Sequence, residues 1–339
     1  MAVSSKVVPK TMQAIIVKAL GEPDVMKIAT IPLPDIDSHQ VLVRVEYAGV
    51  NPVDTYIRSG AFGKVPALPF TPGKDGSGVV YKIGSSINHL KVGDQVWFCA
   101  AVGTPHGSYA EFAVVQGTDT WVLPKGVGLQ IGAALGVPYL TAYRALLVKG
   151  KCRSGQIVFI HGGSGAVGQA CVQIAKKEGL RVVATAGSDT GEEILRGLKV
   201  DGVFSHRGKG YVDYIRDKFP EGFDLIVEMR ADLNLSSDCV LAGRNGRILV
   251  VGNRGPTHTL NARHIMLTEV SIIGVALMAS TKAEWEAGAA YVSKGVGEGW
   301  LAPRISKEYP LEDAPQAHID IIEATEGATG KLLLKIYDD

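Results

Sequence analysis

Apolar residues in the first 128 positions occur in short runs that turn-forming residues interrupt. The runs are rich in β-branched residues and are bounded by Gly, Pro, Asp or Ser, a pattern typical of strands. The predicted strands are Met12–Val17, Val41–Tyr47, Gly78–Ile83, Gln95–Cys99 and Gly107–Val115. This part of the chain is therefore predicted to be a β-rich domain.

From about residue 129 strand-like runs alternate with amphipathic helical stretches. The predicted strands are Gln156–His161, Arg181–Ala186, Gly202–Ser205, Phe223–Met229, Arg247–Val251 and Val270–Ala276. The predicted helices between them are Ala166–Glu178, Glu192–Leu198, Val212–Phe219 and Leu235–Leu241. Such alternation indicates βαβ units and a parallel sheet, and strands as apolar as Ile248–Val251 fit a sheet covered on both faces.

The last part of the chain predicts helices at Lys282–Ser293 and Asp313–Ala324 and a final strand at Lys331–Ile336. The predicted fold class is α/β, with a Rossmann doubly wound parallel-sheet domain and a second, β-rich domain. We place the Rossmann domain at residues 129–277, and the β-rich domain at residues 1–128 and 278–339.

Composition and charge exclude several classes of protein. The chain is 46% hydrophobic with a net charge of +1, so nothing favours nucleic acid as the main partner. No apolar run reaches the roughly 18 residues of a membrane span. Met1–Lys10 lacks the apolar core of a secretory signal and is either a weak transit segment or a frayed leader. The four cysteines have no paired spacing, which fits a reducing compartment, and we expect a cytoplasmic protein.

The strongest chemical signal is the segment Gly163-Ser164-Gly165-Ala166-Val167-Gly168. It matches G-x-G-x-x-G, follows a predicted strand and opens a predicted helix, the setting that a dinucleotide-binding turn needs. We assign the tight turn to Gly163, close approach of the pyrophosphate to Gly165, and close packing of helix and strand to Gly168. The N–H groups at the helix start would bind the anion.

The end of the second Rossmann strand favours NADP(H) over NAD(H). An NAD site usually has an acidic residue there, but the strand Arg181–Ala186 is followed by Gly187 and Ser188. Their N–H groups and the Ser188 hydroxyl can meet a 2′-phosphate, and His206 and Arg207 can add positive charge. Asp189 would argue for NAD(H) if the strand ran further, and Arg207 could also be a solvated surface residue.

Several segments in the same order resemble the medium-chain dehydrogenase/reductase superfamily, and more narrowly its ζ-crystallin-like quinone oxidoreductase branch. The carrying segments are Ala48–Gly60, Pro72–Val79, Val92–Val96, the glycine turn, Pro138–Leu146, Gly252–Gly255 and Gly327–Lys331. The resemblance covers nearly the whole chain. It implies that the β-rich domain is a GroES-like catalytic domain and that the substrate cleft lies between the domains.

The same resemblance implies a protein without zinc. Metal-dependent members place a cysteine just before the position of Pro52 and a Gly-His-Glu triplet in a later turn. Here those places hold Asn51 and Gly73-Lys74-Asp75, which cannot supply the three N, S or O ligands of a catalytic zinc. We therefore predict no metal site.

The resemblance also implies site residues. Asn51 and Tyr56 would line the cleft, where the Tyr56 ring can stack and its hydroxyl can donate a proton; Tyr56 could instead be a core aromatic. Cofactor contacts are implied at Tyr56, Gly163, Ser164, Gly165, Ala166, Val167, Gly168, Gly187, Ser188, His206, Arg207, Asn234, Gly252, Asn253, Arg254, Gly274, Val275, Ala276 and Lys331. Asn234 is equally an N-cap candidate, and Lys331 equally a solvated lysine.

The predicted function is metal-free transfer of reducing equivalents from NADPH to a quinone or a similar electron-poor acceptor. One alternative is an NADPH-dependent reductase of enones or enoyl thioesters, with Tyr56 as proton donor. Another is a nucleotide-binding structural or RNA-binding protein of the crystallin type. We expect a homodimer or homotetramer, in which Val270–Ala276 either extends the sheet into a second copy or forms a buried edge strand.

Overall fold

The computed structural model describes residues 9–63, 65–101, 103–256 and 259–337. The predicted leader, Met1–Lys10, lies almost entirely outside these residues. The chain forms two compact units. The first comprises Met1–Gly136, Lys307–Glu323 and Leu332–Asp339, and the second comprises Val137–Ser306 and Ala324–Lys331.

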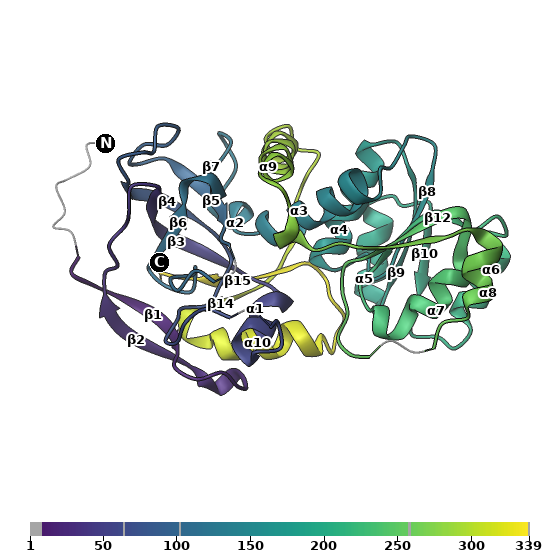
Figure 1. Ribbon diagram of the computed structural model, residues 1–339, viewed down its shortest axis with the longest axis horizontal. Coiled ribbons are helices and arrows are strands. Elements are labelled where there is room, and N and C mark those ends of the chain that lie inside the picture. Colours follow the sequence, from purple (N-terminus) through teal and green to yellow (C-terminus); the bar gives the residue numbers. More distant parts are fainter. Residues whose placement is uncertain (1–8, 64, 102, 257–258, 338–339) are drawn as a thin grey trace. The chain divides into compact units, whose positions relative to one another are not determined.

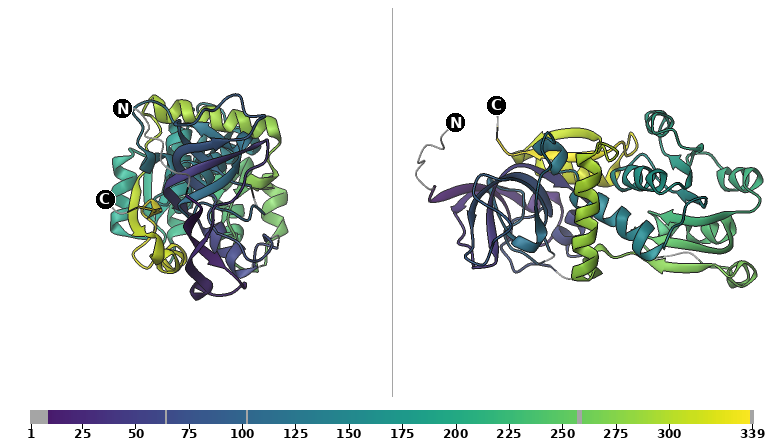
Figure 2. Two further views of the ribbon diagram at one scale, coloured as in Figure 1. Left: turned by 90° about the vertical axis from the view of Figure 1, so that its left-hand side faces the viewer. Right: turned by 90° about the horizontal axis from the view of Figure 1, so that it is seen from above.

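The first unit is built on a seven-stranded sheet. Its strand order is β14 (Ile305–Pro310), β15 (Lys331–Lys335), β3 (Gln40–Val50), β4 (Asp75–Ile83), β5 (Gln95–Cys99) and β7 (Thr120–Val122). The seventh strand, β6 (Phe112–Gln116), pairs with β3. A hairpin of β1 (Thr11–Val17) and β2 (Met26–Pro32) completes its strands. Alternate residues of β3, such as Val41, Val43 and Val45, are fully buried in the core, as expected from the two-residue period of a strand. The yellow C-terminal strand β15 lies along β3 (Figures 1 and 2).

The second unit contains a six-stranded, all-parallel sheet. Its order is β10 (Gly202–Ser205), β9 (Arg181–Ala186), β8 (Ile157–Ile160), β11 (Phe223–Glu228), β12 (Ala242–Val250) and β13 (Ser271–Gly274). In chain order this is the 3-2-1-4-5-6 arrangement of a Rossmann fold, in which ligands bind where the order reverses. The reversal lies between β8 and β11.

Helices cover both faces of the parallel sheet (Figure 1). One face is covered by α4 (Ala166–Lys177) and α5 (Asp189–Gly197), the other by α6 (Tyr211–Lys218), α7 (Ala231–Leu241) and α8 (Ala262–Thr268). The remaining α-helices are α1 (Pro52–Ser59), α2 (Leu129–Gly132), α3 (Gly136–Tyr143), α9 (Lys282–Gly297) and α10 (Ala314–Glu323). The short helices are η1 (Pro23–Val25), η2 (Gly117–Asp119), η3 (Arg144–Lys149), η4 (Leu277–Ala279) and η5 (Leu311–Asp313). Within the described part of the chain, no helix is both long and apolar enough to span a bilayer.

The predicted fold class is confirmed, and the strands Gln95–Cys99, Arg181–Ala186 and Gly202–Ser205 have the predicted bounds. The predicted strand Gly107–Val115 is wrong in its first part, because only Phe112–Gln116 is a strand. The N–H groups of Gly107, Ser108 and Tyr109 donate instead to carbonyls of the loop at Thr71–Gly73.

The boundaries between the two compact units differ from the predicted domain boundaries, which fall after residues 128 and 277. Helix α9 belongs to the second unit, because Arg144 pairs with Glu284 at 2.6 Å and Tyr291 donates to Glu178 at 2.7 Å. Residues 324–331 also belong there, since the Ser164 hydroxyl donates to the Ala328 carbonyl at 2.7 Å. The roles predicted for the two domains remain predictions.

Candidate cofactor site

The glycine-rich turn directly follows β8. The Gly162 N–H donates to Thr185 Oγ1 at 3.1 Å and the Gly163 N–H to the Thr185 carbonyl at 2.8 Å. The tight turn is predicted at Gly163, and the left-handed backbone of this segment is at the preceding residue, Gly162 (φ 58°). Gly163 is needed for packing instead, because a Cβ there would lie 2.7 Å from the Ala184 Cβ.

The turn leads into α4 with its glycines placed for close contact. Gly165 is the N-cap residue, and the first helical hydrogen bond runs from the Gln169 N–H to the Gly165 carbonyl at 2.8 Å. The N–H groups of Ala166, Val167 and Gly168 therefore precede the helical ladder and can bind an anion. A Cβ on Gly168 would lie 2.2 Å from the Gly162 carbonyl oxygen, so helix and turn touch through backbone atoms.

The end of β9 brings together the residues predicted to meet a 2′-phosphate. A Cβ on Gly187 would lie 2.7 Å from the His206 Nε2, and His206 Nδ1 lies 3.1 Å from Thr185 Oγ1. The Ser188 hydroxyl caps α5 by accepting from the Gly191 N–H at 3.1 Å. Asp189 is the first residue of that helix and does not extend β9.

The two residues predicted to add positive charge differ in their surroundings. Partial burial, with the neighbouring His161 and Arg207, lowers the pKa of His206. Arg207 is exposed, and both residues remain predicted contacts of the 2′-phosphate.

Asn234 lies in the first turn of α7, which follows β11, and Gly252 follows the end of β12. Asn234 is not an N-cap, because α7 begins at Ala231 and Arg230 precedes it; its Nδ2 donates to Glu228 Oε1 at 3.2 Å. A Cβ on Gly252 would lie 2.2 Å from the Met229 carbonyl oxygen, so the backbone that follows β12 touches the backbone that follows β11. Asn234 and Gly252 therefore both bond to Glu228 at the end of β11, Asn234 to its side chain and Gly252 to its carbonyl.

Asn253 and Arg254 continue from β12. Asn253 Nδ2 donates to the Gly255 carbonyl at 2.7 Å, and the Arg254 N–H donates to Asp232 Oδ1 at 3.1 Å. Asp232 also accepts two bonds from the Arg230 guanidinium, at 3.1 and 2.8 Å. The loops after β11 and β12 are thus joined to each other by Asp232.

The remaining predicted contacts lie in two further segments. Gly274 ends β13, the Val275 N–H donates to the Val250 carbonyl at 2.9 Å, and Ala276 precedes η4. Lys331 begins β15 and is only 2% exposed, so it is not a solvated lysine. The segment before it lies against the glycine turn, since Ser164 donates to Ala328.

Asn51 and Tyr56 lie in the first unit, on α1. Asn51 is buried; its Nδ2 donates to Asp75 Oδ2 at 2.9 Å, and its N–H donates to Asp54 Oδ2 at 2.9 Å. Asn51 therefore fixes the start of α1 against β4. Tyr56 is half-buried, so the alternative of a core aromatic is wrong.

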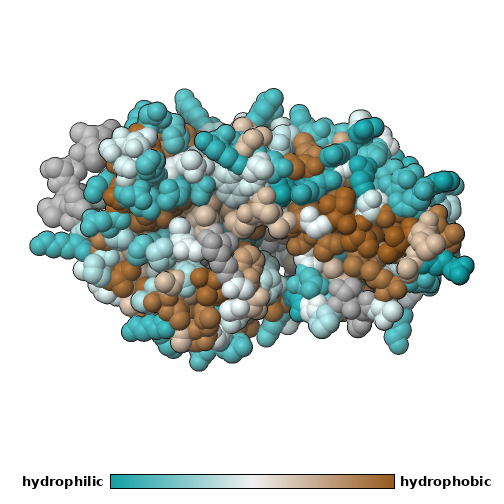
Figure 3. All heavy atoms as spheres, in the orientation of Figure 1, coloured by the Kyte–Doolittle hydropathy of each residue, from teal (hydrophilic) through white to brown (hydrophobic). Residues whose placement is uncertain are grey.

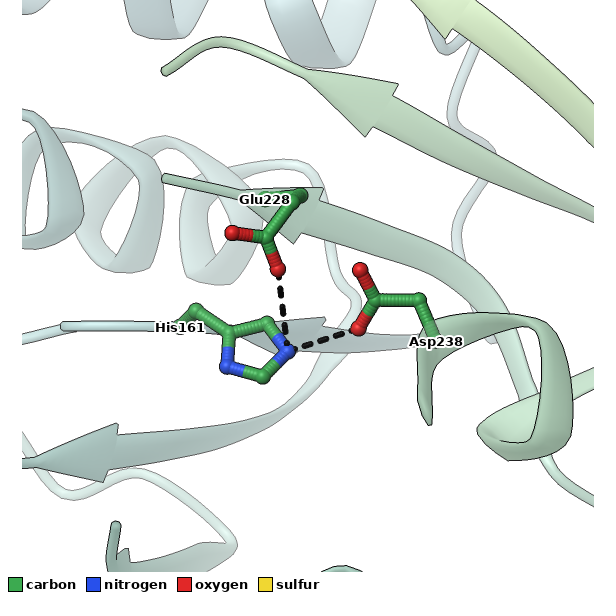
Figure 4. A group of neighbouring side chains, drawn as sticks. All are labelled: His161, Glu228 and Asp238. Carbon is green, nitrogen blue, oxygen red and sulfur yellow. Dashed lines mark hydrogen bonds and ion pairs between the residues drawn. The ribbon is translucent and has the colours of Figure 1, made fainter. Parts of the chain in front are cut away.

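Sequence reasoning missed a buried cluster of His161, Glu228 and Asp238 (Figure 4). His161 follows β8, Glu228 ends β11, and Asp238 comes from α7. The His161 Nε2 lies 2.7 Å from Asp238 Oδ1 and 3.3 Å from Glu228 Oε2. The available signal was a polar residue at the end of each of two apolar strands, His161 and Glu228, because carboxyl ends of neighbouring parallel strands meet at one edge of a sheet.

Comparison with known proteins agrees with this architecture. Residues 37–125 match the alcohol dehydrogenase GroES-like domain, and residues 166–294 match the zinc-binding dehydrogenase family. The chain is 46% identical over 332 residues to quinone oxidoreductase of Mus musculus, covering 96% of this chain and 98% of that protein. It is 43% identical over 327 residues to quinone oxidoreductase of Homo sapiens, with the same coverage of 96% and 98%. A mycobacterial protein solved in complex with NADPH has a TM-score of 0.87 and 25% identity, covering 96% of this chain and all of its own, 100%.

A parallel sheet with a glycine-rich turn at its switch point, joined to a GroES-like unit, defines a nicotinamide-dependent oxidoreductase of the medium-chain dehydrogenase/reductase superfamily. Within that superfamily, the chain belongs to the quinone oxidoreductase family. The predicted resemblance is thereby confirmed.

Proposed function

We propose that the protein transfers reducing equivalents from NADPH to a quinone, without a metal. The observation that carries the proposal is the complete glycine turn at the switch point of a chain 46% identical to a quinone oxidoreductase over nearly its full length. Bound NADPH would supply the reducing equivalents. The chain's own residues bind the cofactor, orient it and shape the acceptor pocket.

The turn fits a pyrophosphate. Gly165 has only the Ala328 Cβ, at 3.4 Å, and the Gly162 carbonyl oxygen, at 3.5 Å, near the position of an added Cβ. These are ordinary van der Waals distances, so the described residues do not crowd this position, and a pyrophosphate would meet the N–H groups at the start of α4. Gly163, Ser164, Ala166, Val167 and Gly168 would complete the cradle.

NADP(H) rather than NAD(H) is supported by the residues after β9. Gly187 and Ser188 are neutral, and Arg207 can pair with a 2′-phosphate through its guanidinium. A phosphate near His206 would also favour its protonated form. Asn234, Gly252, Asn253, Arg254, Gly274, Val275, Ala276 and Lys331 are proposed to contact the remainder of the cofactor.

The absence of zinc is proposed from chemistry at the superfamily's metal positions. The Asn51 amide is bonded to Asp75, and the Lys74 ammonium donates to the Ala100 carbonyl. An ammonium group and an amide cannot replace a thiolate and an imidazole as zinc ligands. We propose that Tyr56 stacks on the acceptor or donates a proton to its reduced oxygen, and that Asn51 positions α1, which carries Tyr56.

Cytoplasmic location and self-association are also proposals. All four cysteines are free thiols, which suits a reducing compartment. Strand β13 is an edge strand, and Met266, Leu267, Ile272 and Met278 beside it are exposed. Figure 3 shows apolar side chains gathered on this face of the second unit. An exposed apolar edge favours strand pairing with a second copy, as a homodimer or as half of a homotetramer.

Oxidation of NADPH, followed by its absorbance, tests the function. Benzoquinone and an enone are compared, each with NADPH and with NADH, before and after treatment with a chelator. We expect NADPH-dependent turnover of the quinone that survives chelation. Turnover of the enone alone would favour the enone reductase, and loss of activity on chelation would refute the metal-free proposal. A Tyr56→Phe variant with an unchanged rate at every pH would exclude Tyr56 as the proton donor.

A further inference from the structure

The cluster of His161, Glu228 and Asp238 lies at the switch point of the parallel sheet. Strands β8 and β11 are the neighbours between which the strand order reverses, and Ile160 pairs with Val227. His161 and Glu228 are the next residues of these two strands, at the edge where Rossmann folds bind their ligand. Glu228 and Asp238 are completely buried, and His161 is 3% exposed.

The cluster is bonded to the segments proposed to hold the cofactor. Glu228 Oε1 accepts from the Arg230 N–H and from Asn234 Nδ2. The Glu228 carbonyl accepts from the Gly252 N–H at 3.2 Å. His161 is followed directly by Gly162, the residue with left-handed backbone in the glycine turn. A change in the protonation of the cluster would therefore affect the loops that follow β8, β11 and β12.

The two carboxyl groups need a proton between them. The Glu228 Oε2 and Asp238 Oδ2 atoms are buried and accept no hydrogen bond from a donor group among the described residues, and the two carboxyl side chains lie within hydrogen-bonding reach of each other. Both carboxyl groups approach the same imidazole nitrogen (Figure 4). Burial raises the pKa of Glu228 to about 8 and that of Asp238 to about 7, while burial lowers the pKa of His161. Near neutral pH the cluster thus retains a proton on its acidic groups.

The ionisable groups that face the cluster from neighbouring elements do not titrate in this range. Tyr211 of α6 has its pKa raised to about 12 by burial and by Asp238 and Glu228. Burial raises the pKa of the Cys239 thiol and lowers that of His206. Arg230 directs its guanidinium to Asp232. Without a ligand, a proton exchanged near neutral pH is therefore assigned to the cluster itself, and variants of the cluster separate it from a proton that His206 takes up beside a phosphate.

We propose that the His161–Glu228–Asp238 cluster positions the cofactor loops and takes up a proton when the dinucleotide phosphate binds. The inference rests on the proposed binding of NADPH. The phosphates of NADPH bring negative charge to the turn that follows His161, and a nearby negative charge favours the protonated form of a carboxyl group. By reciprocity, protonation of the cluster strengthens NADPH binding.

Calorimetry of NADPH binding to the wild-type protein measures the proton directly. Titrations at pH 8 in two buffers of different ionisation enthalpy should show uptake of roughly half a proton or more per NADPH bound. The Kd should rise by about three- to tenfold between pH 7 and pH 9, as expected if binding shifts the pKa by up to about one unit. The 2′-phosphate, with a pKa near 6, is already ionised over this range and does not produce the effect.

Two variants and a matched control locate the proton. Glu228→Gln keeps an oxygen for the Arg230 N–H and Asn234 but removes the titrating group, and Asp238→Asn removes the other. Each single variant should reduce the change in Kd between pH 7 and pH 9, and the double variant should reduce it to less than about twofold. The control is Asp224→Asn, on the same strand, where Asp224 Oδ2 accepts from the Ile157 N–H at 2.8 Å away from the carboxyl end. It should keep the wild-type pH dependence.

The outcomes separate this inference from the proposed function. Wild-type protein that does not bind NADPH would refute the proposed function and this inference with it. NADPH binding without proton uptake, or a full pH dependence that persists in the double variant of Glu228 and Asp238, would refute only the inference. If the variants do not fold, the proton count of the wild-type protein still decides the result.

Discussion

Each unit of the molecule buries acidic groups beside a strand end, but the two units balance their charge differently. In the first unit, Asp75 accepts from the Asn51 amide at 2.9 Å, and the adjacent Lys74 brings a buried positive charge. Asp75 and Lys74 act in opposite directions on the pKa of the Cys99 thiol, which burial raises most. In the second unit, Glu228 and Asp238 lie beside each other and both approach the imidazole of His161, whose pKa burial lowers.

The consequence is that the two units respond to different ranges of pH. In the first unit, burial raises the pKa of Tyr109 and lowers that of His318 to about 3, and these two groups are bonded at 3.0 Å. Neither changes its charge near neutral pH. In the second unit, Glu228 and Asp238 titrate close to neutral pH. A buried acid that accepts from a neutral amide, as Asp75 does from Asn51, holds the structure together, whereas two buried acids that share a proton respond to pH.

The largest effect should come from Asp75→Asn in the first unit. This change replaces the buried carboxyl group that accepts from the Asn51 amide at 2.9 Å, and weakening that buried hydrogen bond should cost about 3 kcal/mol of the free energy of unfolding. Urea denaturation at neutral pH measures it, with the exposed Asp35→Asn as control, expected within about 0.5 kcal/mol of wild type. A loss for Asp75→Asn no greater than that of the control would remove the distinction between the units.

Glu228→Gln in the second unit should raise the free energy of unfolding at alkaline pH, whereas Asp75→Asn lowers it. A carboxyl group whose pKa is raised on folding stabilises the protein fully below its unfolded pKa and loses that stability as pH rises through its folded pKa. For Glu228 and Asp238 this loss ends near pH 7 to 8, with a slope of at most about 1.4 kcal/mol per pH unit for each proton.

The measurement is urea denaturation of both proteins at pH 6 and pH 9. Glu228→Gln should equal the wild type within about 1 kcal/mol at the lower pH and be more stable by about 2 kcal/mol at the higher. Asp224→Asn again serves as the control, because Asp224 lies in the same strand. Equal pH dependence in wild type and Glu228→Gln would show that the cluster does not titrate in the folded protein.

The sequence predicts the two units much better than it predicts these clusters. Hydrophobic periodicity is a local property, and it placed Arg181–Ala186 and Gly202–Ser205 at their observed bounds. The glycine turn was also found locally, although its left-handed residue is Gly162. Helix α7 begins earlier than predicted because the first turn, Ala231–Asn234, has little apolar periodicity.

The buried cluster could not be found in this way because it depends on tertiary neighbours. His161 and Asp238 are 77 residues apart in the chain. Their contact requires β8 and β11 to be adjacent, which is a property of the strand order and not of any local pattern. The partners of Asn51 follow the same rule, since its amide reaches Asp75 on β4, 24 residues away.

The smallest effect should come from His318 of the first unit, and it should appear on the acidic side. Burial, with the charge of Arg58, lowers the pKa of His318 from 6.5 to about 3 in the folded protein. A histidine with a lowered folded pKa contributes stability above its unfolded pKa and loses it as pH falls. His318→Asn should therefore reduce the loss of stability between pH 7 and pH 5.5 by about 1 kcal/mol. Urea denaturation at both pH values measures this difference, and the exposed His39→Asn should leave it unchanged. An identical loss of stability between pH 7 and pH 5.5 in His318→Asn and wild type would show that His318 contributes none of this pH dependence.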